Sequence, residues 1–207
     1  MSTENQSVCA VVVAAGSSRR MGGENKLLLP LCGKPVLAHT LTAFQMCGAV
    51  RDIVLVCREQ DMEVYRTLAA ENGITKLRTL TRGGDTRTES VLAGVSAASE
   101  ACALVAVHDG ARPLVSDEVI TQAVAEAAKT GAAAPVVPVK DSIKRIENGK
   151  IAADVPRDTL AAVQTPQVFR RDMLLHALLD AAANGRSFTD DCAAVEALGQ
   201  TVSATSG

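Results

Sequence analysis

Aromatic side chains are scarce in this sequence, which contains no tryptophan, one tyrosine and three phenylalanines among its 207 residues. Even so, 47% of the residues are hydrophobic, and most of these are alanine, valine or leucine. A chain of this length and apolar content can bury a sizeable core in one domain. Small and branched aliphatic side chains suit parallel strands covered by alanine-rich helices, so we predict a single α/β domain over residues 1–207.

An excess of positive charge is also missing, because 21 lysine and arginine residues are balanced by 23 acidic residues, giving a formal net charge of −2. Generic binding to nucleic acid or to an anionic membrane depends on such an excess, so we expect neither partner. There is no uninterrupted apolar run of about 18 residues, and the polar start Met1–Ser7 does not fit a signal peptide. We therefore predict a cytoplasmic protein in which any anionic ligand meets a local basic cluster.

Paired cysteines are the third absence. None of the six cysteines belongs to a CxxC pair, most lie inside apolar runs, and the three histidines lack the spacing of metal ligands. Free thiols buried in a reducing cytosol explain this pattern better than disulfides or a zinc site do.

Strand patterns alternate with helical patterns over most of the chain. Buried strands are predicted at Val8–Ala14, Ile53–Cys57, Leu77–Thr81 and Ala103–Val107. Helices are predicted to begin at Pro35, at about Asp61, after the N-cap residues Asp85 and Ser116, and at about Arg170 and Thr189. This alternation indicates βαβ units, so we predict a Rossmann-like, mostly parallel sheet with helices on both faces. Ligands bind such sheets beyond the carboxyl ends of the strands.

One segment, Ser142–Val155, breaks the alternation. It holds two short runs around Asn148-Gly149, and Asn-Gly between such runs is a strong hairpin signal. We therefore predict a β-arm over about residues 140–157 that projects from the sheet and mediates dimerisation. A bare two-stranded arm is only marginally stable unless it packs against something. A partner subunit is a natural cover, and the alternative is a hairpin folded back on its own domain.

A loop of small and basic residues, Ala14–Lys26, follows the first predicted strand. Its small residues would let backbone N–H groups approach a phosphate closely, and its basic side chains could neutralise a polyphosphate. The loop matches neither the Walker A pattern nor GxGxxG, which removes the main support for a kinase or a dehydrogenase. Taken alone, it is equally consistent with a plain surface turn.

A second polar loop, Val107–Pro113, ends another predicted strand at the same edge of the sheet. Asp109 could hold a divalent cation against phosphates, and Arg112 could bind a second anion. Alternatively, Asp109 caps a turn and Arg112 pairs with it. Two such loops at one edge favour a shared ligand site over two unrelated turns.

Seven short segments, in the same order, carry a family resemblance over roughly Val8 to Gly199. They are AAGSSRRMG with Asn25-Lys26, GGDTRTESVLAG (83–94), VHDGARP (107–113), PVKDSIKR (138–145), DVPR (154–157), QTPQVF (164–169) and FTDD (188–191). The chain resembles the 2-C-methyl-D-erythritol 4-phosphate cytidylyltransferase family. The resemblance implies an enzyme of the non-mevalonate isoprenoid pathway that uses Mg²⁺, joins CTP to that polyol phosphate and releases pyrophosphate, without a covalent enzyme intermediate.

The resemblance also implies roles for individual residues. The catalytic positions are Arg20, Lys26 and Arg157. The positions that enclose CTP are Ala14, Ala15, Gly16, Gly84, Asp85, Ser90 and Gly110. The positions around the polyol phosphate are Arg112, Ser142, Arg157, Thr165 and Thr189, and Asp109 is the metal-associated carboxylate. Because Ser142 and Arg157 lie on the arm, the resemblance implies a homodimer in which each arm completes the partner's site.

The sequence departs from the family pattern at three places. Ser18 stands where many relatives have glycine, and Ser142 stands where threonine is usual. The sequence ends at Gly207, where the family continues through a strand and a helix that supply an aspartate near the metal and a lysine near the phosphates. We expect this third difference to weaken metal and triphosphate binding. Two rival functions remain open: a cytidylyltransferase acting on ribitol 5-phosphate, and a catalytically inactive nucleotide-binding protein.

Overall fold

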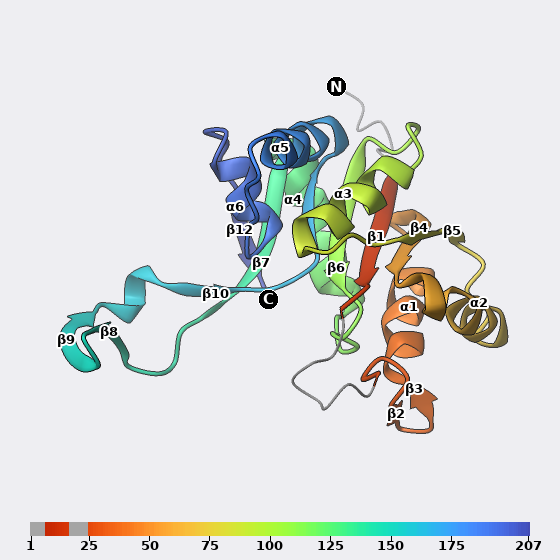
Figure 1. Cartoon of the computed structure of the whole chain (residues 1–207), viewed down its shortest axis with the longest axis horizontal. Coiled ribbons are helices and arrows are strands. Elements are labelled where there is room, and N and C mark those ends of the chain that lie inside the picture. Colours follow the sequence, from red (N-terminus) through yellow and green to blue (C-terminus); the bar gives the residue numbers. More distant parts are fainter. Residues whose placement is uncertain (1–6, 17–24) are drawn as a thin grey trace.

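The computed structural model describes residues 7–16 and 25–207 (Figure 1). Its central element is an eight-stranded sheet in the order β10-β7-β11-β6-β1-β4-β5, with β12 beside β7. The bounds are β1 Val8–Ala14, β4 Val50–Cys57, β5 Leu77–Arg82, β6 Leu104–Asp109, β7 Ala132–Pro138, β10 Ala161–Val163, β11 Gln167–Arg170 and β12 Ser203–Ser206. Strands β1, β4, β5 and β6 pair in parallel, as do β7 and β12, whereas β10 and β11 are antiparallel to their neighbours. These pairings confirm the predicted α/β fold with a mostly parallel sheet.

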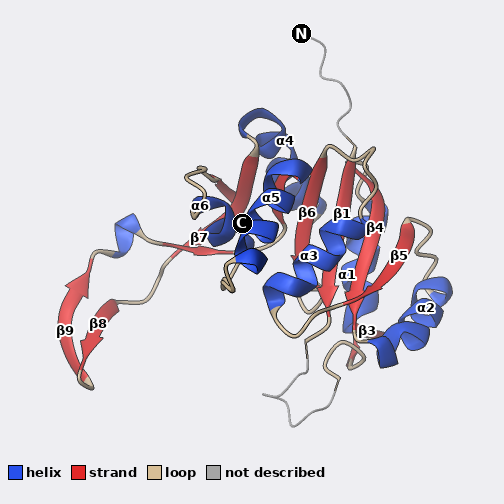
Figure 2. Cartoon of the chain, turned by 45° about the horizontal axis from the view of Figure 1, so that its top comes forward, coloured by secondary structure: helices blue, strands red, loops and turns tan. Residues whose placement is uncertain are grey.

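Helices cover both faces of the sheet, as the alternating pattern predicts (Figures 1 and 2). Successive residues of β1 point to opposite faces, so Cys9 and Val11 pack with α3, α5 and α6, while Ala10 and Val12 pack with α1 and α2. The helix bounds are α1 Val36–Met46, α2 Met62–Glu71, α3 Arg87–Ala97, α4 Asp117–Thr130, α5 Arg171–Ala183 and α6 Asp191–Glu196. Within the described ranges, no helix is both long enough and apolar enough to cross a bilayer.

The start of α3 corrects one prediction, because Thr86 rather than Asp85 is its N-cap. The Thr86 hydroxyl accepts a hydrogen bond from the Glu89 backbone N–H at 3.1 Å, and the Glu89 carboxylate accepts one from the Thr86 N–H at 3.2 Å. This reciprocal capping box satisfies two backbone donors that the first helical turn would otherwise leave unpaired. The Glu89 carboxylate also accepts a bond from the Asp85 N–H, so the loop before α3 is fixed by the helix that follows it.

Besides strands β7, β10, β11 and β12, four short elements were not predicted from the sequence. Strands β2 (Pro30–Leu31) and β3 (Lys34–Pro35) form a small hairpin before α1, and Cys32 and Gly33 at its turn have φ angles of 49° and 82°. Single-turn 3₁₀ helices occupy Glu59–Asp61, before α2, and Arg157–Thr159, after β9.

The predicted hairpin is present as β8 (Ile143–Glu147) paired antiparallel with β9 (Lys150–Val155). Its two-residue turn, Asn148-Gly149, has φ angles of 50° and 75°, the left-handed values that a type I′ turn requires. Figures 1 and 2 show the arm extending away from the sheet rather than folding back over it. Ile146 and Ile151 are 59% and 70% exposed, so the apolar side chains of the arm lack cover from their own chain.

The six cysteines are all free thiols, but one of them contradicts the expectation of general burial. Cys32 is exposed at the β2–β3 turn, whereas Cys9, Cys47, Cys57, Cys102 and Cys192 are buried. Burial raises the pKa of each of these five thiols, to about 11 for Cys57. A raised pKa lowers the thiolate fraction, and the thiolate is the reactive species.

We expect a water-soluble disulfide reagent to label one thiol per folded chain rapidly at neutral pH, because Cys32 alone is accessible. All six should react after denaturation in urea. Cys32→Ser should abolish the rapid phase, which the absorbance of the released thiolate measures. Rapid labelling of a second cysteine in the folded protein would contradict the burial of the other five.

Candidate active site

The two polar loops singled out in the sequence meet at the carboxyl edge of the sheet. Strands β1 and β6 are in register so that Val13 pairs with Asp109, and the Gly110 N–H donates to the Val13 carbonyl oxygen at 2.9 Å. A Cβ atom at Gly110 would lie 3.1 Å from that same oxygen, so glycine permits this close approach. The end of β1, where the first loop begins, therefore lies directly beside the start of the loop after β6.

The segment before α3 completes this edge. A Cβ atom on Gly83 would lie 2.5 Å from Ala15 Cβ and 2.8 Å from Ser90 Oγ. The segment before α3 therefore contacts Ala15, just after β1, and glycine permits this close approach. The Ser90 hydroxyl accepts a bond from the Gly84 N–H at 3.2 Å. Of the positions that the resemblance assigns to CTP, the structure thus brings together Ala14 with Gly110 and Gly84 with Ser90, and Ala15 lies against Gly83. Gly16 and Asp85 directly follow Ala15 and Gly84 in the chain.

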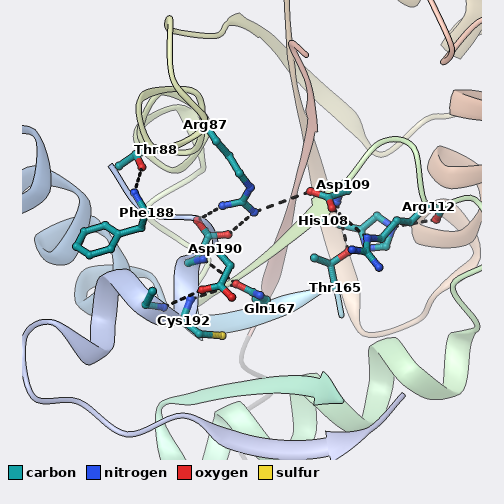
Figure 3. A network of polar contacts seen from close by, with 12 residues as sticks. Arg87, Thr88, His108, Asp109, Arg112, Thr165, Gln167, Phe188, Asp190 and Cys192 are labelled. Atoms are coloured by element: carbon teal, nitrogen blue, oxygen red, sulfur yellow. Dashed lines mark hydrogen bonds and ion pairs between the residues drawn. The ribbon is translucent and has the colours of Figure 1, made fainter. Parts of the chain in front are cut away.

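Asp109, at the end of β6, is paired with two arginines (Figure 3). Arg112 Nε donates to its Oδ2 at 3.0 Å, and Arg87 Nη2 lies 3.9 Å from its Oδ1. The Asp109–Arg112 contact is the pairing that the sequence allowed as an alternative to ligand binding. Because both side chains remain partly exposed, at 37% and 47%, they stay accessible to a ligand.

Arg87, at the start of α3, belongs to the most buried charge pair near this edge. Its guanidinium donates in bidentate fashion to Asp191 at 2.9 and 2.8 Å, and the Asp191 side chain is 2% exposed. Burial raises the pKa of the Asp191 carboxyl, and the bonds from Arg87 oppose that shift. Gln167 Oε1 accepts from the backbone N–H groups of Asp191 and Cys192, which ties the start of α6 to β11.

Arg87, Asp191 and His108 have no role that could be predicted from the sequence. All three lie inside segments that carry the family resemblance, but nothing in their spacing indicates that residues 104 positions apart form one ion pair. His108 is fully buried at the end of β6, where its Nε2 is 3.1 Å from the Arg112 carbonyl oxygen and its Nδ1 is 3.0 Å from Thr165 Oγ1. It therefore links the Asp109 loop to the segment before β11.

Burial lowers the pKa of His108 from 6.5 to about 4, against weaker opposing hydrogen bonds and the nearby Asp109 carboxylate. In the unfolded chain the same imidazole binds a proton near its ordinary pKa, so between these values the unfolded state holds more protons and folding stability falls as pH falls. We expect His108 to remove roughly 2 kcal/mol of stability between about pH 7 and about pH 4.5. Urea unfolding of the wild type and of His108→Asn measures this, since the variant should lose that part of the pH dependence. An unchanged pH dependence in the variant would contradict a buried neutral ring, and His176→Asn, at an exposed site on α5, is the matched control.

Lys26 follows a firmly anchored residue. The Asn25 side chain accepts a bond from the Leu27 N–H at 3.2 Å and donates to the Tyr65 hydroxyl at 2.9 Å. Burial raises the pKa of Tyr65 to about 12, so its hydroxyl keeps its proton and can also donate to Asn25 Oδ1 at 3.3 Å. The exposed Lys26 side chain is thus presented from a fixed turn, while Arg20 and Ser18 lie outside the described residues.

The remaining sites predicted for the polyol phosphate are divided between two regions. Arg112 and Thr165 belong to the edge described above, and the exposed Thr189 directly precedes Asp190, the N-cap of α6. Ser142 and Arg157 are exposed on the arm, where Arg157 donates to the Lys140 carbonyl oxygen at 2.7 Å. Since the arm extends away from the ends of β1 and β6, these two residues do not join the cluster of their own chain (Figure 1).

A divalent cation fits this edge only together with a phosphorylated ligand. The described residues contain no group of three His, Cys, Asp or Glu side chains that could hold a metal ion. Mg²⁺ is commonly held by one or two carboxylates together with substrate phosphates, so Asp109 alone suffices on the protein side. The donor set therefore fits a cation carried by a triphosphate and not a closed protein cage.

Nucleotidyltransferases share this arrangement. The first strand of a parallel sheet leads into a loop of small residues, and the neighbouring strand of the sheet, here β6, ends in a carboxylate followed by a basic group. The family model of 2-C-methyl-D-erythritol 4-phosphate cytidylyltransferase, IspD, matches residues 8–207. The chain belongs to this family and is therefore an enzyme of the nucleotidyltransferase class.

Individual relatives agree with the family match. The protein named 2-C-methyl-D-erythritol 4-phosphate cytidylyltransferase from Dehalococcoides mccartyi is 42% identical over 204 residues, which cover 98% of this chain and 88% of that protein. The protein of the same name from Bacillus licheniformis is 43% identical over 198 residues, with 95% and 85% covered. The crystal structure of 4-diphosphocytidyl-2C-methyl-D-erythritol synthase from Anaerococcus prevotii superposes with a TM-score of 0.88 at 26% identity, covering 99% of this chain and 88% of that one.

Proposed function

We propose that this chain, as one nucleotidyltransferase domain, transfers the cytidylyl group of CTP to 2-C-methyl-D-erythritol 4-phosphate in isoprenoid biosynthesis and releases pyrophosphate. The observation that carries the proposal is the register of β1 and β6, which pairs Val13, just before the small-residue loop, with Asp109 in a chain of this family. A nucleotide needs both the close backbone approach and the charged groups, and this edge supplies them together.

The chemistry needs one bond to form and one to break at the α-phosphorus of CTP. A phosphate oxygen of the polyol phosphate attacks that phosphorus, and the bond to the pyrophosphate leaving group breaks in line with it. Phosphoryl-type transfers depend mainly on positioning and on stabilising charge that spreads over the phosphate oxygens. Lys26 would supply positive charge along the triphosphate, together with Arg20, and Arg112 would bind the acceptor substrate.

We further propose Mg²⁺ as the cofactor, with Asp109 as its protein ligand. The cation would neutralise triphosphate charge when bound. Asp109 would hold the cation through its carboxylate, which is 37% exposed although Arg112 donates to its Oδ2 at 3.0 Å. Arg112, which is 47% exposed, would remain accessible to the acceptor phosphate beside that carboxylate.

Measuring pyrophosphate release with each polyol phosphate identifies the acceptor substrate. With CTP and Mg²⁺ present, we expect kcat/KM for methylerythritol phosphate to exceed that for ribitol 5-phosphate by at least about tenfold, the factor that a difference of 1.4 kcal/mol in transition-state binding produces. A preference for ribitol 5-phosphate would replace the proposed substrate. Calorimetric binding of CTP without turnover of either polyol phosphate would instead indicate an inactive nucleotide-binding protein.

We also propose a cytoplasmic homodimer in which the arm of each subunit completes the partner's site. The uncovered Ile146 and Ile151 on the arm support the dimer, and six free thiols support a reducing compartment. Mixing Arg157→Ala chains with Arg20→Ala chains tests the shared site, because a mixed dimer would hold one site with both residues intact. Recovered turnover is the expected result, and no recovery despite subunit exchange shown by mass spectrometry would contradict the arrangement.

A further inference from the structure

His108 has a defined tautomer, which its two partners determine. A carbonyl oxygen can only accept a hydrogen bond, so Nε2, at 3.1 Å from the Arg112 carbonyl oxygen, must carry a proton. The ring is fully buried and packs edge-on against Phe44, with ring centroids 4.9 Å apart, surroundings that favour the neutral form. A neutral imidazole protonated at Nε2 leaves Nδ1 with a lone pair and no proton.

This tautomer determines the direction of the next hydrogen bond. Thr165 Oγ1 lies 3.0 Å from Nδ1, and since Nδ1 can only accept, the threonine hydroxyl must donate its single proton to it. The backbone N–H of Asp109 then donates to Thr165 Oγ1 at 3.4 Å. With its proton and one lone pair engaged, the hydroxyl has one lone pair left for a ligand.

We propose that His108 is a positioning residue whose Nδ1 accepts the hydrogen bond of the Thr165 hydroxyl, so that Thr165 accepts a hydrogen bond from a hydroxyl group of the acceptor substrate and does not bind its phosphate. This inference rests on the proposed transfer to a polyol phosphate.

The proposal follows from the polarity of the possible ligands. At neutral pH a phosphate monoester presents mainly acceptor oxygens, which cannot pair with an acceptor-only Thr165. A polyol hydroxyl can donate, and it is small enough to reach a side chain that is only 7% exposed. The phosphate of the same substrate must therefore be bound by cationic groups, of which Arg112 lies on the loop that His108 holds.

Nuclear magnetic resonance tests the tautomer without any turnover. In long-range ¹H–¹⁵N spectra of the ¹⁵N-labelled protein, the signals lost in His108→Asn identify this ring among the three histidines. We expect them to show a neutral ring with its proton on Nε2. A proton on Nδ1, or on both nitrogens at neutral pH, would overturn the proposal because Thr165 would then be free to donate.

Steady-state kinetics test the hydrogen bond between Thr165 and the acceptor substrate. Thr165→Val removes the hydroxyl with little change of shape and should raise KM for the polyol phosphate about tenfold, while KM for CTP changes less than about twofold. Thr165→Ser should restore the wild-type KM for the polyol phosphate, because it keeps the hydroxyl. An unchanged KM for the polyol phosphate in Thr165→Val would overturn the contact.

Two amides at position 108 separate positioning from simple structural support. Asparagine can place an acceptor oxygen where Nδ1 lies, whereas glutamine can place a donor where Nε2 lies. We expect His108→Asn to keep KM for the polyol phosphate within about threefold of wild type and His108→Gln to raise it as far as Thr165→Val does. A raised KM in His108→Asn and a near-normal KM in His108→Gln would contradict the proposal. That result would show that substrate binding depends on the hydrogen bond from His108 to the Arg112 carbonyl oxygen and not on the one from Thr165.

The substrate used in these assays is whichever polyol phosphate the wild type turns over. Turnover of ribitol 5-phosphate alone would overturn the proposed function, while the KM pattern of the four variants would still decide this inference. A wild type without turnover of either substrate would overturn both, because Thr165 would then have no acceptor substrate to select.

Discussion

Replacing Arg87 by methionine is expected to lower the free energy of unfolding by about 3–5 kcal/mol, the cost of leaving a buried carboxylate without its partner. Arg87 holds Asp191 through two hydrogen bonds of 2.9 and 2.8 Å, and the Asp191 side chain is 2% exposed. The methionine side chain offers no donor to replace the lost guanidinium. Urea unfolding followed by circular dichroism measures the change.

The matched control for this prediction is an arginine whose ion pair is exposed. Arg82 pairs with Glu59 at 3.3 Å, with both side chains more than 70% exposed, so Arg82→Met should change stability by less than about 1 kcal/mol. The double variant Arg87→Met with Asp191→Leu removes both buried charges and should recover much of the loss. Equal effects of Arg82→Met and Arg87→Met would contradict a special role for the buried pair.

Replacing Lys26 by alanine is expected to lower kcat by at least about tenfold, and by as much as about a hundredfold, with a much smaller effect on KM for CTP. The physical reason is that its ammonium group should act on charge that develops at the α-phosphate in the transition state. Steady-state pyrophosphate release at saturating CTP and polyol phosphate measures the change in kcat.

Two further variants make the Lys26 result specific. Lys34→Ala removes an exposed lysine from the β2–β3 hairpin and should leave kcat within about twofold of wild type, because water and salt screen an exposed charge outside the predicted site. Lys26→Arg keeps the charge but changes its geometry, so its activity should lie between those of Lys26→Ala and the wild type. A normal kcat in Lys26→Ala would contradict the proposal that Lys26 stabilises charge in the transition state.

The sequence alone was sufficient to predict the elements that position the site, because each has a strong local signal. Apolar runs gave β1 and β6, proline and glycine marked helix ends, and Asn148-Gly149 gave the arm. The meeting of the two loops also followed from one general rule, that parallel strands carry ligands at their carboxyl ends.

Elements that depend on distant residues were not predictable in this way. The alanines of β7, Ala132–Ala134, favour helix by propensity, but they form a strand because both faces are buried in the hydrophobic cores. The pairing of Arg87 with Asp191 likewise depends on the packing of α5, which contacts both α3 and α6. Asp85 was a reasonable cap, yet the Thr86–Glu89 spacing was the better signal and was present in the sequence.

The arm can open locally while the sheet remains folded. Strands β8 and β9 are held together mainly by their own ladder, and most of their residues are exposed. Amide hydrogens in such a unit exchange with solvent through local opening, which does not require the sheet to unfold. The exchange rate of the arm is therefore independent of core stability, and its dependence on protein concentration would report subunit association directly, even in variants that have lost all catalytic activity.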